Sequence, residues 1–229
     1  MAVATALDED GLAPRRARSR HREWSARGVR ANFVGEQDRL AGLPGQAAGV
    51  WLPGQVVGDC AEDVQAILAD LGISRPAVWG SSAGGPHALA TAALLPHAAA
   101  AVSLFAPLAS SADWWMDRWA ERAGTDAAHS RLWADYLALC NRDGFGDGDE
   151  GWWEDWSASF QPWGADLAAI KAPVILWHGL QDTSPPPAHS RWLATRIPHV
   201  TAHFPAGEDH TNVEENNRAA AFAWTRQHI

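Results

Sequence analysis

A serine framed by glycines, between an apolar run and an alanine-rich segment, constrains the fold of this chain more than any other feature. The apolar run is Ala77–Trp79, the turn at 80–84 reads Gly-Ser-Ser-Ala-Gly, and the alanine-rich segment spans 87–95. This order predicts a strand, a tight turn and a helix. Glycines two positions either side of a serine let the helix start pack closely on the strand, so the serine is exposed at the corner. Only Ser82 has both glycines; Ser81 does not.

A serine at such a corner becomes a nucleophile only when a base removes its proton. The predicted base is His210, because it lies between the last predicted strand and the last predicted helix. The predicted acid is Asp182, which follows the apolar run 174–177. Loops in both places reach the C-terminal edge of a parallel sheet, and the order Ser, Asp, His is the one used with this turn. The Ala83 backbone N–H, at the helix start, is predicted to stabilise an oxyanion.

Other residues compete for these roles. Asp209 and Asp113 are the alternative acids, and a Gly/Ser-rich turn without function is the alternative interpretation of 80–84. His87 is predicted to lie inside the helix after the turn. The remaining candidates have no comparable context and are interpreted as surface histidines: His97, His129, His189, His199, His203 and His228.

Other segments predict an α/β fold with a mostly parallel sheet and helices on both faces. A capping box formed by Asp59 and Glu62 predicts a helix of about a dozen residues that ends at Gly72. Apolar runs without alternation are typical of strands buried on both faces. The expected strands and helices after the serine turn are strands at 100–105, 174–177 and 200–204 and helices at 188–196 and 213–227.

The stretch between the expected strands at 100–105 and 174–177 is far longer than a simple connection needs. It predicts a helical cap inserted at 110–171. The cap range holds eight tryptophans, which we interpret mainly as its core, although a few could roof a pocket for an apolar substrate: Trp114, Trp115, Trp119, Trp133, Trp152, Trp153, Trp156 and Trp163.

Charge and composition exclude several classes of function. The formal net charge of -9 opposes binding to nucleic acid, and no apolar run is long enough to span a membrane. The opening MAVATAL lacks the basic region of a secretory signal. Cys60 and Cys140 show no CxxC spacing, which favours free thiols in a reducing cytoplasm over disulfides or a metal site. We therefore expect a cytoplasmic protein that acts on a small molecule.

Three stretches together resemble the α/β-hydrolase fold superfamily, in particular its capped members with a serine nucleophile: Asp59–Ala90, Ala172–Pro198 and Pro205–Val213. The resemblance implies a triad of Ser82, Asp182 and His210, a cap, a core formed by 58–109 and 172–229, and no cofactor. A serine at 82 speaks against the dehalogenase branch. The implied function is hydrolysis of a small ester or amide through an acyl-enzyme. The alternative is a catalytically silent scaffold or ligand-binding protein.

Residues 1–57 depart from the pattern of this superfamily. They are rich in Arg, Gly and Pro and lack the His-Gly pair that supplies a second oxyanion N–H in the superfamily. We interpret them as an irregular or aberrant segment, as a truncated start and a local reading-frame error would produce. Unless 31–34 or 47–52 pair with it, the strand Ala77–Trp79 is predicted to lack a neighbour on one side.

Overall fold

The computed structural model describes residues 2–5, 56–109 and 158–229. Predictions made for other positions lie outside this part of the chain. They concern most of the N-terminal segment and the cap over 110–157, with Asp113, His129, Cys140 and every cap tryptophan except Trp163.

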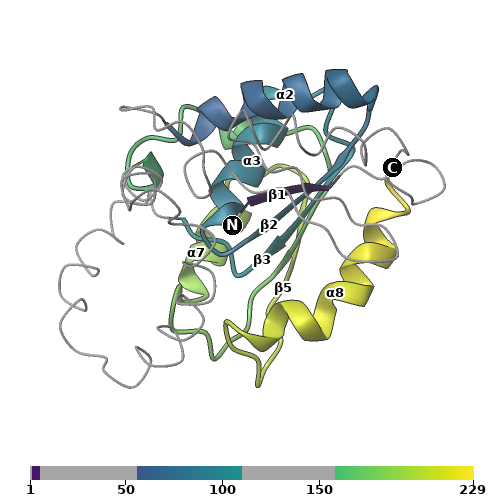
Figure 1. Ribbon diagram of the computed structural model, residues 1–229. Helices are drawn as coiled ribbons and strands as arrows, with labels where there is room; N and C mark the ends of the chain where they lie inside the picture. Colours follow the sequence, from purple (N-terminus) through teal and green to yellow (C-terminus); the bar gives the residue numbers. More distant parts are fainter. Residues whose placement is uncertain (1, 6–55, 110–157) are drawn as a thin grey trace, which may run out of the picture.

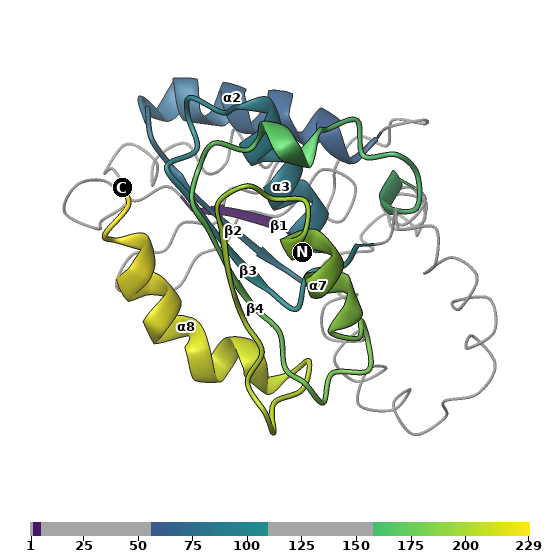
Figure 2. The same ribbon diagram turned by 180° about the vertical axis from the view of Figure 1, so that it is seen from behind.

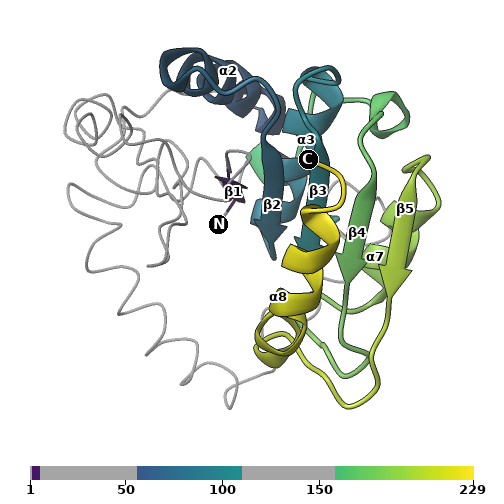
Figure 3. The same ribbon diagram turned by 90° about the vertical axis from the view of Figure 1, so that its right-hand side faces the viewer.

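Within the described residues, five strands form one sheet in the order β1-β2-β3-β4-β5 (Figures 1 and 3). Four of them are parallel: β2 (Ala77–Ser81), β3 (Ala101–Phe105), β4 (Val174–Trp177) and β5 (Val200–His203). The carboxyl ends of parallel strands meet at one edge of a sheet. The loops that carry the predicted site residues therefore gather along that edge.

The first strand corrects one prediction. β1 (Ala2–Thr5) is antiparallel to β2, with Ala2 opposite Gly80 and Thr5 opposite Ala77. The expectation that Ala77–Trp79 has no neighbour on one side is therefore wrong. The partner of β1 lies more than seventy positions away in the chain, so no local sequence pattern records the pairing.

Helices cover both faces of the sheet, as expected. α3 (Gly84–Leu94) and α7 (Ala188–Ala194) lie on one face, and α8 (Asn212–Thr225) lies on the other (Figures 2 and 3). Side chains of successive strand residues point alternately to the two faces of the sheet. Val78, Val102, Leu104, Val174 and Leu176 belong to the main core with Leu89 and Leu193, whereas Trp79 and Phe105 pack with Ala221 and Phe222 of α8.

The helix before the serine turn at 80–84 begins differently from the prediction. α2 (Cys60–Leu71) has the expected length and ends at Gly72, whose φ of 69° is left-handed. Asp59 is the N-cap residue of α2, but its side chain makes no capping hydrogen bond, so the predicted capping box with Glu62 is wrong. Asp59 ends the 3-10 turn η1 (Val57–Asp59) in helical geometry, and its carboxylate accepts the Val56 N–H at 2.8 Å.

The end of the predicted cap range packs with the core. Trp163 is buried beside the 3-10 turn η2 (Leu167–Ala169), and its carbonyl accepts the Gly58 N–H at 2.7 Å. Trp163, Leu167 and Ile170 share the main core with α3. This tryptophan therefore stabilises the sheet region itself.

Candidate active site

Ser82 occupies a strained corner between β2 and α3. Its φ of 52° is left-handed, a conformation that costs a non-glycine residue about 1 kcal/mol. Its N–H donates to the Phe105 carbonyl at 2.9 Å, and its own carbonyl accepts the Gly85 and Leu108 N–H groups. A Cβ on Gly80 would lie 2.7 Å from both Ala88 Cβ and Gly84 O. Gly80 is thus needed for the close approach of α3 to β2.

The loop after β3 holds this corner from the side. Ala106 also has a left-handed φ, 41°, and donates its N–H to the Trp177 carbonyl at 2.8 Å. The turn brings Pro107 against Gly85, where an added Cβ would lie 2.5 Å from the Pro107 Cβ. Two neighbouring strand ends therefore fix the position of Ser82.

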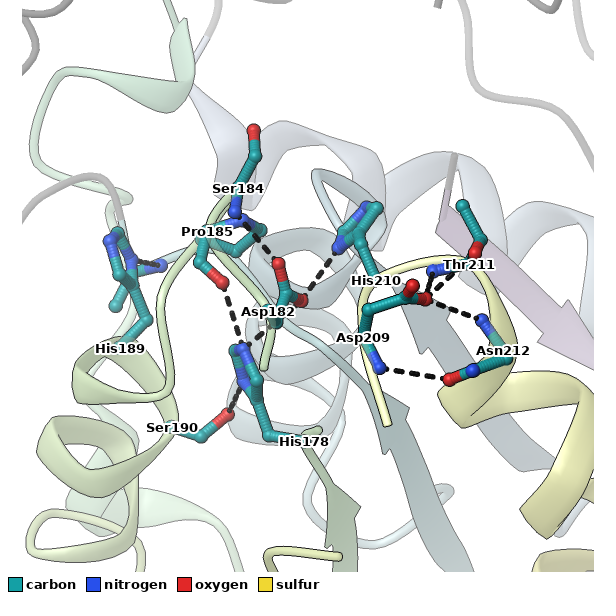
Figure 4. A network of polar contacts seen from close by, with 11 residues as sticks. His178, Asp182, Ser184, Pro185, His189, Ser190, Asp209, His210, Thr211 and Asn212 are labelled. Carbon is teal, nitrogen blue, oxygen red and sulfur yellow. Dashed lines mark hydrogen bonds and ion pairs between the residues drawn. The ribbon is translucent and has the colours of Figure 1, made fainter. Parts of the chain in front are cut away.

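Asp182 and His210 form a hydrogen-bonded pair (Figure 4). His210 Nδ1 lies 2.8 Å from Asp182 Oδ2, and Asp182 Oδ1 accepts the Ser184 N–H at 2.7 Å. Only 3% of Asp182 is exposed. An ionised carboxylate only accepts, so Nδ1 of His210 carries the proton, and Nε2 of the neutral ring is the basic nitrogen.

Two loops are joined along their backbones to make this pair. Leu180 N–H donates to Pro205 O at 3.0 Å, and Gln181 N–H donates to Glu208 O at 2.9 Å. Gly179 permits this approach, because a Cβ there would lie only 2.2 Å from Glu208 O. The loop after β4 and the loop after β5 therefore act as one unit.

The environment of Asp182 favours its ionised form. Burial raises the pKa of Asp182, but the hydrogen bonds from His178, His210 and the Ser184 N–H outweigh burial and hold the pKa below its usual range. A carboxylate in this state can orient His210 and stabilise its imidazolium form.

Asp209, the alternative acid, has a different set of partners. Its Oδ1 accepts the Thr211 N–H, the Thr211 hydroxyl and the Asn212 N–H at 2.7 to 3.1 Å. Hydrogen bonds from Thr211 and Asn212 hold the pKa of Asp209 below its usual range. This carboxylate shapes the turn that leads into α8.

Two of the other candidate histidines are buried. His87 lies in α3 as expected, its Nδ1 is 3.2 Å from Ala83 O, and burial lowers its pKa to about 4. His189 is a correction: it is fully buried on α7, its Nδ1 accepts the Ala109 N–H at 2.8 Å, and burial lowers its pKa to about 3. The predicted surface position of His189 is therefore wrong. The sequence could not show that the Ala109 N–H, eighty positions away, would satisfy a buried imidazole here. His97 and His199 are exposed.

Sequence reasoning missed a second histidine beside the acid. His178 is fully buried, and its Nε2 lies 3.3 Å from Asp182 Oδ2 and 2.9 Å from Pro185 O. Its Nδ1 lies 2.5 Å from Ser190 Oγ. The only available signal was the His-Gly pair at 178–179, directly before the acid loop.

The predicted residues follow three different strands of the same sheet edge. Ser82 follows β2, Asp182 follows β4 and His210 follows β5, and Ala83 is the N-cap residue of α3. The described contacts join Asp182 to His210. The hydrogen bonds described for Ser82 are made by its backbone.

Within 2–5, 56–109 and 158–229, no three His, Cys, Asp or Glu side chains are placed to hold a metal ion. Over the same ranges, no helix combines the length and apolar character needed to cross a bilayer. Cys60 is a free buried thiol, and burial raises its pKa to about 12.

Solved structures similar to this chain share one fold. An esterase from Thermogutta terrifontis is 19% identical with a TM-score of 0.61, covering 85% of this chain and 82% of its own. A carboxylesterase of Nitrososphaera gargenis is 18% identical with a TM-score of 0.61, covering 82% and 80%. The monoacylglycerol lipase of Paleococcus ferrophilus is 18% identical with a TM-score of 0.56, covering 100% and 99%. No protein-family model and no curated protein matches the sequence.

The chain has the α/β-hydrolase fold, which the resemblance predicted. Its four parallel strands, its elbow at Ser82 and its acid-histidine pair at the carboxyl edge are arranged on that fold.

Proposed function

We propose that this protein is a serine hydrolase that cleaves a small, apolar ester or amide through an acyl-enzyme. One observation carries the proposal: the buried Asp182–His210 hydrogen bond lies at the same sheet edge as the left-handed turn at Ser82. The similar structures described as esterases and a lipase support ester hydrolysis as the activity.

The proposed reaction divides between the side chains as follows. His210 Nε2 takes the proton of the Ser82 hydroxyl as the oxygen attacks the substrate carbonyl, and then returns the proton to the leaving group. Water attacks the resulting acyl-enzyme with the same base and frees Ser82. Asp182 keeps the proton on His210 Nδ1 and stabilises the imidazolium form.

The proposed oxyanion donor is the Ala83 N–H, with the α3 dipole behind it. We further propose that the substrate is a small molecule in the cytoplasm and that nucleic acids and membranes are not partners. The net charge of -9 supports the first of these exclusions.

Labelling by a fluorophosphonate, together with hydrolysis of a short-chain aryl ester, tests the nucleophile. Ser82→Ala should abolish both labelling and hydrolysis, because it removes the attacking oxygen. Ser81→Ala is the matched control and should keep both. Persistent labelling of Ser82→Ala would place the nucleophile elsewhere. A folded wild-type protein that is neither labelled nor active would instead favour a silent scaffold.

A further inference from the structure

His178 is a buried polar group that the proposed reaction does not use. It directly follows β4, its side chain is fully buried, and it has partners on both ring nitrogens. Figure 4 shows it reaching Asp182 from a different side than His210. A fully buried imidazole on a buried carboxylate calls for a physical explanation.

The partners of His178 fix its protonation pattern. Nε2 lies 2.9 Å from the Pro185 carbonyl and 3.3 Å from Asp182 Oδ2, and both oxygens can only accept. Nε2 therefore carries a proton. In the neutral ring Nδ1 then accepts a hydrogen bond from the Ser190 hydroxyl, whose oxygen lies 2.5 Å away. The ring is thus oriented from α7 and directs an N–H at the acid loop.

Asp182 is consequently restrained from three directions. Its Oδ1 accepts the Ser184 N–H, and its Oδ2 lies within reach of both His210 Nδ1 and His178 Nε2. Because His178 also binds Pro185 O, it ties the carboxylate to the backbone of its own loop. If the Asp182 carboxylate rotated away from His210, it would also lose its contact with His178.

We infer that His178 is a positioning residue: its Nε2–H holds the Asp182 carboxylate in the orientation that binds His210. The contact between His178 and Asp182 is present in the structure whatever reaction the protein catalyses. The catalytic consequence of the contact rests on the proposed function.

Three other titratable groups face His178 and Asp182. His210 and Asp209 come from the loop after β5, and His189 comes from α7. All three are unchanged in variants of His178, so a change in the titration of Asp182 in such a variant reports on His178.

The test compares His178→Leu, His178→Gln and His189→Leu in the full chain. Gln keeps an N–H donor near the position of Nε2, and His189→Leu removes a second buried histidine, whose Nδ1 accepts the Ala109 N–H. Two quantities are measured: the pH midpoint of the Asp182 carboxyl carbon signal by NMR, and kcat and KM for a short-chain aryl ester.

In His178→Leu the midpoint of Asp182 should move to higher pH, because one donor to its carboxylate is gone. Its kcat should fall about tenfold with KM unchanged, since the base is less well oriented. His178→Gln should restore most of both quantities. His189→Leu should lower thermal stability and move the midpoint much less than His178→Leu does, because the His189 ring binds the Ala109 N–H.

An unchanged midpoint and kcat in a folded His178→Leu protein would overturn the inference. If His178→Leu does not fold, Ser190→Ala replaces it, because this variant removes the hydrogen bond that orients the His178 ring. The Asp182 midpoint should then move to higher pH as well. An unmoved midpoint in Ser190→Ala overturns the inference. A midpoint that moves as expected in a chain without any hydrolysis supports the contact and refutes the proposed function.

Discussion

Gly179 offers the sharpest test of how the acid and the base are held together. In Gly179→Ala the new Cβ would lie 2.2 Å from Glu208 O and 2.4 Å from its carbonyl carbon. Ordinary contact requires the backbone at 208–209 to withdraw by about 1 Å. Such a shift breaks the hydrogen bond from Gln181 N–H to Glu208 O and carries His210 away from Asp182.

A misplacement of about 1 Å in a catalytic group lowers the rate by about 100-fold, or about 2.7 kcal/mol of activation free energy. The assay is kcat/KM for a short-chain aryl ester, with the melting temperature recorded on the same samples.

Gly207→Ala provides the matched control in the same loop. Gly207 has a left-handed φ of 80°, but a Cβ there meets no atom within 4 Å. This variant should lose about 1 kcal/mol of folding stability and keep most of its activity. A folded Gly179→Ala protein with kcat/KM equal to that of the Gly207→Ala control would refute the argument that the close approach at Gly179 sets the acid-base geometry.

Two further predictions concern single side chains. Asp182→Asn should keep the fold and lower kcat by up to about 10⁴-fold, because His210 loses its orienting acceptor, whereas Asp209→Asn should cost much less; the reverse order in the ester assay would assign the acid to Asp209. Burial lowers the pKa of His87 to about 4 in the folded chain, against 6.5 when unfolded, so its contribution to stability is complete above pH 6.5 and is lost as the pH falls toward 4. Urea unfolding should show a loss of about 3 kcal/mol over this range that His87→Leu lacks, and an equal loss in His87→Leu would show that other groups cause it.

The sequence predicted the parallel strands and the helices because each shows a local pattern, such as an apolar run without alternation for a buried strand or apolar residues at helical spacing for a helix. The apolar runs that became β3, β4 and β5 lie within a residue of their predicted bounds, and Gly72 ends α2 where expected. The elbow was predictable because a left-handed serine beside a closely packed helix needs glycine at position 80, and that requirement is visible in sequence.

Other features depend on contacts that no local pattern records. The pairing of β1 with β2 joins segments more than seventy positions apart. Asp59 has the sequence of a helix cap, yet η1 places it in helical geometry, where it binds Val56 instead. His189 reads as a surface residue until its partner, the Ala109 N–H, is known.

The His-Gly pair at 178–179 follows β4, the strand that leads to the acid. In the structure both residues serve that acid: Gly179 admits the backbone of Glu208, and His178 contacts the Asp182 carboxylate. Replacing Gly179 should therefore move His210, whereas replacing His178 should loosen Asp182 with the loop backbone in place. If both act only on the single Asp182–His210 contact, the double variant should lose much less activity than the product of the two single losses.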